Sequence, residues 1–160
     1  MKPLSIFKIK VGYISHCKKC QERSTQKHVS CECAEQEVVD IGPIWLGPLF
    51  DSSFIRQISK QSESSSSIQK GKKFSKLMPC LVEESYLSEF EQEPVGYYNY
   101  HNYCKNGKDL PKLEKVIQKL KEMGFVASKS HFEKMAIRTN ASTKELKSAI
   151  HLVSVIEKNT

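Results

Sequence analysis

The stretch CKKCQERSTQKHVSCEC at residues 17–33 carries four of the chain's six cysteines. Cys17 and Cys20 form a C-x-x-C pair, and Cys31 and Cys33 form a C-x-C pair after a ten-residue loop. A structural Zn²⁺ ion is bound tetrahedrally by four such ligands, with no coordination position left open. We therefore predict a structural Zn²⁺ site at Cys17, Cys20, Cys31 and Cys33 that holds together a small β-rich subdomain.

Other interpretations of this stretch stay open. His16 or His28 could replace one cysteine as a ligand. The four thiols could also carry no metal, as in a site that has decayed. A redox-active C-x-x-C pair is disfavoured because no βαβ pattern surrounds it.

The hydropathy pattern argues against a membrane partner. The longest apolar runs are far shorter than the roughly 18 residues needed to cross a bilayer, and the N-terminal residues lack the apolar core of a signal peptide. We expect an intracellular protein, nuclear or cytoplasmic. In a reducing compartment, six cysteines are better explained by metal binding than by disulfides.

The order of predicted elements indicates an α+β fold with two subdomains. Short strands at 11–15 and 37–39 flank the cysteine stretch, and two Gly-Pro steps predict an irregular segment at 41–49. A short helix capped by Asp51 or Ser52 follows. We place the boundaries at 1–60 for a zinc-binding β-rich subdomain with a short helix, 61–76 for a flexible Ser- and Lys-rich linker, and 77–160 for a winged-helix-like subdomain.

The C-terminal subdomain has the clearest periodicity. A helix interrupted near Pro79 is expected first. The next helix carries an apolar stripe and ends at Gly124, a residue typical of helix C-caps. Two strands, at 125–128 and 136–139, and a last helix follow. Helix, turn, helix and a two-stranded wing is the order of a winged-helix module. The stripe consists of Leu113, Val116, Ile117, Leu120 and Met123.

The charge distribution points to a polyanionic partner. The chain has 25 Lys and Arg against 18 Asp and Glu, a net charge of +7. Residues 105–138 hold nine basic and four acidic side chains, so five of these seven charges lie in about a fifth of the chain. Phosphate contact explains this concentration, and a solubilising surface is the alternative. The candidate RNA contacts are Lys112, Lys115 and Lys119 on the helix and Lys129, His131 and Arg138 on the presumed wing.

Two groups of motifs resemble a known family. Gly12-Tyr13-Ile14, the cysteine pairs and the segment GPIWLGPL at 42–49 resemble the start of the C-terminal domain of tRNA guanine-26 N2-dimethyltransferases. Tyr97-Tyr98, the segment FVASKSHF at 125–132 and IRTNA at 137–141 resemble that family's closing motif. The order matches over nearly the whole chain. Departures are the C-x-C pair, where the family has C-x-x-C, and Ser130, where it usually has Thr.

The resemblance implies a tRNA-binding portion of an S-adenosylmethionine-dependent tRNA guanine-N2 methyltransferase, with that cofactor bound only in the full-length relative. The partners it implies are tRNA and the family's methyltransferase domain. We find no Gly-rich cofactor loop and no Asp-Pro-Phe/Tyr-Gly catalytic motif in the sequence. We therefore expect no methyl transfer from this chain alone, although it resembles part of an enzyme. The alternatives are a free-standing zinc and winged-helix module that binds nucleic acid or protein, and a remnant used for protein interaction.

Overall fold

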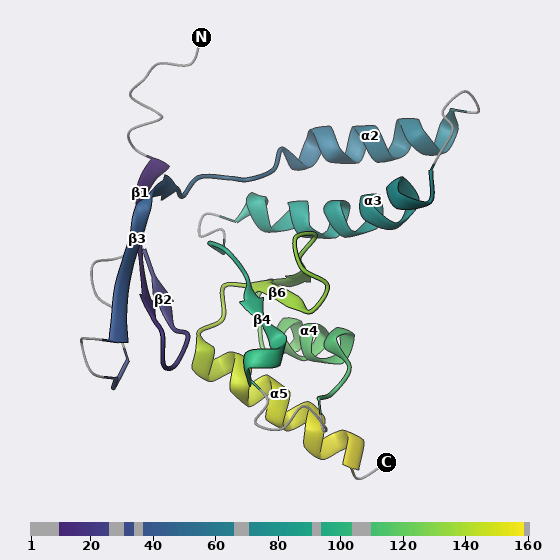
Figure 1. Cartoon of the computed structure of the whole chain (residues 1–160). Coiled ribbons are helices and arrows are strands. Elements are labelled where there is room, and N and C mark those ends of the chain that lie inside the picture. The colour runs from purple at the N-terminus through teal and green to yellow at the C-terminus, as the bar shows by residue number, and fades with distance from the viewer. Residues whose placement is uncertain are drawn as a thin grey trace. The chain divides into compact units, whose positions relative to one another are not determined.

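The computed structural model describes residues 10–25, 31–33, 37–65, 71–90, 94–103 and 110–158 (Figure 1). These residues form two small antiparallel sheets and four α-helices, so the predicted α+β class is confirmed. They divide into two compact units: residues 1–47 with 142–144, and residues 48–141 with 145–160. None of the described helices is both long enough and apolar enough to span a membrane.

The first unit is a three-stranded sheet. Strands β1 (Val11–Cys17), β2 (Arg23–Ser24) and β3 (Val38–Trp45) pair antiparallel in the order β2-β1-β3. The expected strands at 11–15 and 37–39 are confirmed. The expected irregular segment at 41–49 is wrong in its first half, because β3 continues through the Gly42-Pro43 step. Its pairing with β1 shifts register between Gly12 and Ile14, and this irregularity accommodates the Gly-Pro pair.

The second unit begins with two helices that lie side by side (Figure 1). Helix α2 (Ser52–Ser64) starts at Asp51, whose carboxylate accepts a hydrogen bond from the Phe54 N–H at 3.0 Å. This is the predicted cap. Helix α3 (Lys72–Ser85) contains Pro79 and leads into the 3-10 helix η2 (Tyr86–Glu89).

The predicted interruption at Pro79 is wrong, because α3 runs through it. The segment that we predicted as a linker, 61–76, includes the end of α2 and the start of α3. Residues 66–70 of that segment lie outside the described residues.

The rest of the second unit is a three-stranded antiparallel sheet with two helices. Strand β4 (Tyr98–Asn99) and the 3-10 helix η3 (Tyr100–Tyr103) precede α4 (Leu113–Glu122). Strands β5 (Ala127–Lys129) and β6 (Ala136–Thr139) form the predicted hairpin, and α5 (Thr143–Lys158) follows it. The sheet order is β4-β6-β5, so β6 is the central strand.

The hydrophobic core of this unit lies between the sheet, α4 and α5. The predicted stripe of α4 supplies four fully buried residues, and Met123 packs against the same core. Gly124 ends the helix with φ +91°, a left-handed conformation that favours glycine, and the Phe125 N–H donates to the Leu120 carbonyl at 3.0 Å. The side of α4 that faces away from the core carries mainly charged side chains, among them Glu114, Lys115 and Lys121.

Candidate metal centre and nucleic-acid interface

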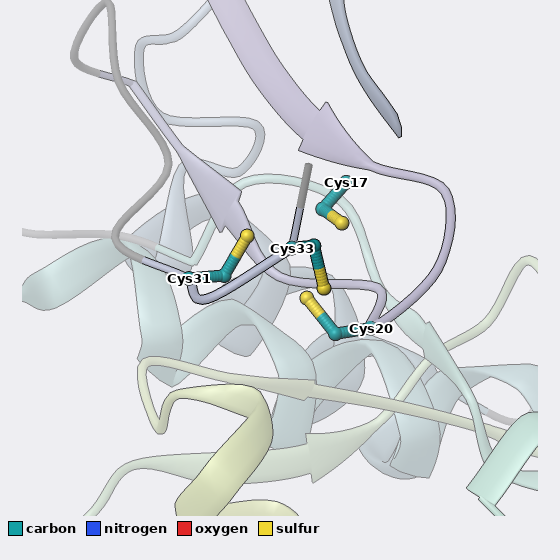
Figure 2. Close-up of side chains that lie close together, drawn as sticks. All are labelled: Cys17, Cys20, Cys31 and Cys33. Carbon is teal, nitrogen blue, oxygen red and sulfur yellow. The ribbon is translucent and has the colours of Figure 1, made fainter. Parts of the chain in front are cut away.

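The two cysteine pairs meet in the first unit. Cys17 is the last residue of β1, Cys20 lies in the turn after it, and Cys31 and Cys33 come from the segment that leads toward β3. The four Sγ atoms all lie within 4.8 Å of one another, and Figure 2 shows the four side chains close together. The C-x-C spacing therefore brings both of its sulfurs to the same place as the C-x-x-C pair.

Backbone hydrogen bonds fix the turn that carries the first pair. The Gln21 N–H donates to the Cys17 carbonyl at 2.9 Å, and the Cys17 N–H donates to the Glu22 carbonyl at 2.9 Å. Gln21 has φ +69°, which closes the turn tightly. The Lys18 N–H donates to the Glu37 carbonyl at 2.8 Å and ties the turn to the start of β3. The sulfurs of Cys17 and Cys20 are thus held by local structure on both sides.

The thiols of Cys17, Cys20 and Cys33 have shifted pKa values. Hydrogen bonds from the backbone N–H of Cys20 lower the pKa of the Cys17 thiol to about 7. Burial raises the pKa of Cys20 to about 12, and burial also raises the pKa of Cys33. Four thiolates this close repel one another, so full deprotonation needs a positive charge among them. A bound divalent cation supplies that charge and releases the protons.

The donor set also fits zinc by distance. A tetrahedral Zn²⁺ with Zn–S bonds of about 2.3 Å separates its sulfurs by about 3.8 Å, and the observed sulfurs lie within 4.8 Å of one another. Among the described residues, the cluster contains cysteines alone, so His16 is not in it. His28 lies outside the described residues.

The predicted RNA-contact lysines lie around α4 in the second unit. Lys112, directly before the helix, is exposed and makes no ion pair with a described residue. Lys115 pairs with Glu157 at 2.8 Å and Lys119 with Glu122 at 3.3 Å. These pairs are partly exposed, and such pairs contribute little to stability. In such a pair, Lys115 or Lys119 can give up its carboxylate partner and bind a phosphate group in its place.

The three candidates on the presumed wing lie in different surroundings. Lys129 is paired with Glu114. Arg138 is 1% exposed, so our placement of it as an RNA contact at a wing tip is corrected. Strand β6 is the central strand and all four of its residues are buried. His131, in the β5–β6 loop, keeps 22% of its side chain exposed.

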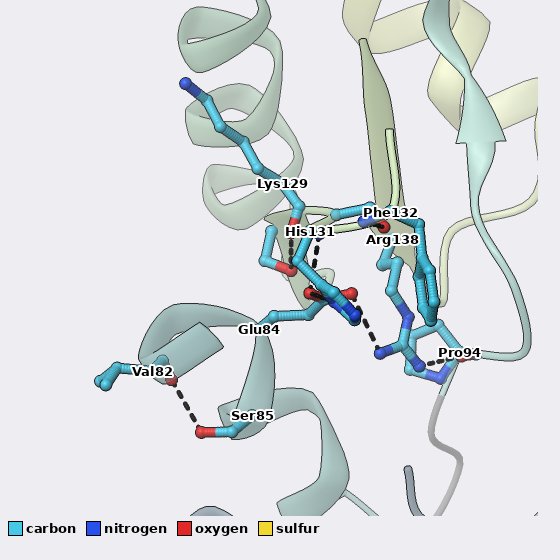
Figure 3. Close-up of polar contacts among 10 residues, drawn as sticks. Val82, Glu84, Ser85, Pro94, Lys129, His131, Phe132 and Arg138 are labelled. Atoms are coloured by element: carbon cyan, nitrogen blue, oxygen red, sulfur yellow. Dashed lines mark hydrogen bonds and ion pairs between the residues drawn. The ribbon is translucent and has the colours of Figure 1, made fainter. Parts of the chain in front are cut away.

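Glu84 connects two of these candidates, and nothing local in the sequence indicated it. Its carboxylate is fully buried near the end of α3 and lies between His131 and Arg138 (Figure 3). One oxygen lies 2.6 Å from His131 Nδ1 and accepts the His131 N–H at 3.0 Å. The other lies 3.3 Å from the Arg138 guanidinium, which also donates to the Pro94 carbonyl at 2.7 Å. The cluster fixes the β5–β6 loop to α3.

Together these features define an α+β domain with a four-cysteine candidate metal site and a lysine-bearing helix face. The chain belongs to the family of N2,N2-dimethylguanosine tRNA methyltransferases, which matches residues 6–151. It corresponds to the C-terminal domain of these proteins, as the motif resemblance implied.

Relatives in archaea and animals match nearly the whole chain. The tRNA (guanine(26)-N(2))-dimethyltransferase of Methanobrevibacter smithii is 33% identical over 152 residues, which are 90% of this chain and 37% of that protein. The tRNA (guanine(27)-N(2))-dimethyltransferase of Bos taurus is 22% identical, over 88% of this chain and 28% of that protein. The solved structure of Trm1 from Pyrococcus horikoshii with S-adenosyl-L-methionine has a TM-score of 0.64 and 27% identity, covering 88% of this chain and 35% of that one. The chain therefore spans about a third of the length of the relatives it matches.

Proposed function

We propose that this chain is the tRNA-binding portion of an enzyme that methylates a guanine N2 of tRNA. The observation that carries the proposal is the family match over residues 6–151. In this proposal the family's methyltransferase domain binds S-adenosylmethionine, which supplies the methyl group. The residues of this chain bind and orient the tRNA, inside the nucleus or the cytoplasm. Relatives named for guanine 26 and for guanine 27 both match, so the proposal specifies the kind of guanine modification and not its position.

We assign tRNA binding to the winged-helix-like part, residues 77–160. The sheet order β4-β6-β5 and the position of α4 directly before the β5–β6 hairpin support this assignment. The exposed side of α4 offers Lys112, Lys115 and Lys119 for phosphate contacts. Such contacts give affinity for any nucleic acid of suitable shape and make it depend on salt.

Filter binding tests the assignment. We expect tight binding to a tRNA transcript and at least tenfold weaker binding to duplex DNA with the same number of phosphates. Lys112→Ala should weaken tRNA binding and reduce the slope of log Kd against log salt by about 1. Lys60→Ala, which removes an exposed lysine of α2, is the matched control and should change neither. Equal affinity for tRNA and DNA would instead favour a general nucleic-acid module.

For the cysteine cluster we propose a structural Zn²⁺ bound by Cys17, Cys20, Cys31 and Cys33. The convergence of four sulfurs supports this proposal. Elemental analysis should find one zinc ion per chain, and the Cys20→Ser variant should lose it. Cys80→Ser, which changes a cysteine outside the cluster, should keep it. A chelator should change the circular dichroism spectrum, because a structural zinc contributes folding free energy. Absence of zinc together with an unchanged spectrum would contradict the proposal.

A further inference from the structure

Three rings gather at the β5–β6 loop, and neither the core nor the metal site uses them. Phe132 is 63% exposed. Its ring centroid lies 3.9 Å from that of His131, with the planes tilted by 38°, and 6.4 Å from that of Tyr97, with the planes 22° apart. We call Tyr97, His131 and Phe132 the aromatic platform. Phe132 is the exposed ring of this set, whereas Tyr97, directly before β4, and His131 are partly buried.

The loop that carries the platform is held in place by buried polar groups. Glu84 accepts the His131 N–H at 3.0 Å and faces its Nδ1. The Phe132 N–H donates to the Ser130 hydroxyl at 3.2 Å, and the Ser130 N–H donates to the Ala136 carbonyl at 3.1 Å. Figure 3 shows Phe132 next to His131, above the Glu84–Arg138 pair. The exposed ring is therefore preorganised, and a ligand that stacks on it need not order the loop first.

The surroundings of Phe132 suit a ligand that joins a flat ring to a phosphate better than they suit an apolar protein surface. Its next two residues in the loop, Glu133 and Lys134, are both exposed and carry opposite charges. Lys134 makes no ion pair within the described part of the chain, and its ammonium is available for a phosphate. An exposed aromatic ring and an exposed lysine two residues later in the same loop match the two parts of a nucleotide, the base and the phosphate.

We propose that the aromatic platform stacks an unpaired nucleobase of RNA, with Lys134 contacting an adjacent phosphate and Glu84 acting as the positioning residue of the loop. The identity of that RNA as tRNA rests on the proposed function. The stacking itself does not, because every base has a ring face and an unpaired base exposes it. A base inside a duplex is already stacked on both sides, so a fully paired helix gains nothing from the platform.

Binding measurements with Phe132→Leu test the proposal, because leucine keeps an apolar side chain and removes the ring face. The probes are a tRNA transcript, a single-stranded oligouridylate and a blunt RNA duplex, titrated with the full chain. We expect Phe132→Leu to weaken binding to the first two by about 5- to 150-fold, the range of one base–aromatic stack. Affinity for the duplex and the slope of log Kd against log salt should stay unchanged.

The matched control is Phe54→Leu, because Phe54 on α2 is exposed to nearly the same extent, 59%. It should leave all three affinities unchanged. Equal effects of the two substitutions would contradict the proposal that the aromatic platform stacks a nucleobase. No effect of Phe132→Leu would also contradict it and would point to a protein segment as the ligand of the exposed ring. Binding of oligouridylate that depends on Phe132, without binding of tRNA, would support the platform and contradict the proposed function. Absence of binding to any RNA would overturn both.

Discussion

Replacing Glu84 by glutamine tests the central polar cluster of the second unit. The substitution keeps the shape of the side chain and removes its charge. Glu84 is 0% exposed and Arg138 is 1% exposed, so the guanidinium loses its carboxylate partner in a place that water does not reach. Breaking a buried ion pair by removing one member costs about 3–5 kcal/mol. Against a domain stability of about 5–15 kcal/mol, this is a large fraction of the free energy of unfolding.

Equilibrium urea denaturation, followed by circular dichroism of the helices, measures the loss. With a urea dependence of about 2 kcal/mol/M, the unfolding midpoint of Glu84→Gln should fall by about 2 M. The neighbouring Glu83→Gln is the control: Glu83 pairs with Lys121 at 2.9 Å, and both side chains are more than 40% exposed. An exposed pair of this kind contributes about 0–1 kcal/mol.

A midpoint for Glu84→Gln no lower than that for Glu83→Gln would refute the reasoning. A second variant separates the charge effect from the packing effect. The double substitution Glu84→Leu with Arg138→Met removes both charges and keeps apolar volume. It should recover much of the lost stability, because a buried pair is often replaceable by apolar side chains.

Three further perturbations probe other parts of the structure. Ile137→Ala, at a fully buried position of β6, should lower the free energy of unfolding by about 2–5 kcal/mol in the same denaturation assay. Gly47→Ala would place a methyl group into the ring of Trp45; it should cost about 1–3 kcal/mol and shift the fluorescence of this single tryptophan, whereas an unchanged emission spectrum would contradict the contact. The Arg56 guanidinium, 2.5 Å from Glu89, lowers the pKa of that carboxyl. The stabilisation is therefore present above the ordinary Glu pKa of about 4.3 and is lost as pH falls through the lower folded-state pKa. Glu89→Gln should accordingly flatten the acid limb of the stability–pH curve; an unaltered acid limb would count against the ion pair.

Features set by local sequence were predictable. The apolar stripe of α4 and its glycine cap depend on spacing within one helix, and both are confirmed. The cap of α2 at Asp51 is equally local. The proximity of the four cysteines was predictable for a different reason, since two cysteine pairs within one short stretch match the four ligands of a structural metal site.

Features set by distant residues were not predictable. Pro79 removes one helical hydrogen bond, and the sequence alone favoured an interruption there. Helix α3 nevertheless continues through Pro79, and Met78 and Glu84 on this helix are buried. The sequence placed Arg138 on a presumed wing, but β6 is the central strand of its sheet and all four of its residues are buried. The buried partner of that arginine, Glu84, lies 54 positions earlier in the chain. No local pattern distinguishes it from the exposed Glu83.

The same separation limits what the sequence shows about the proposed RNA contacts. Charge counting locates the basic surplus in residues 105–138, but it does not show which lysines pair with carboxylates. Lys129 is paired with Glu114, whereas Lys112 and Lys134 make no ion pair with a residue that the structure describes.

Photo-crosslinking of the full chain to tRNA that contains 4-thiouridine tests most directly whether this domain holds tRNA through its C-terminal part. Crosslinked peptides are mapped by mass spectrometry. Our account predicts that they come mainly from residues 110–122, around α4, and from residues 130–135, in the β5–β6 loop. Crosslinks confined to α2 and α3, or tRNA that gives no crosslink at all, would contradict it.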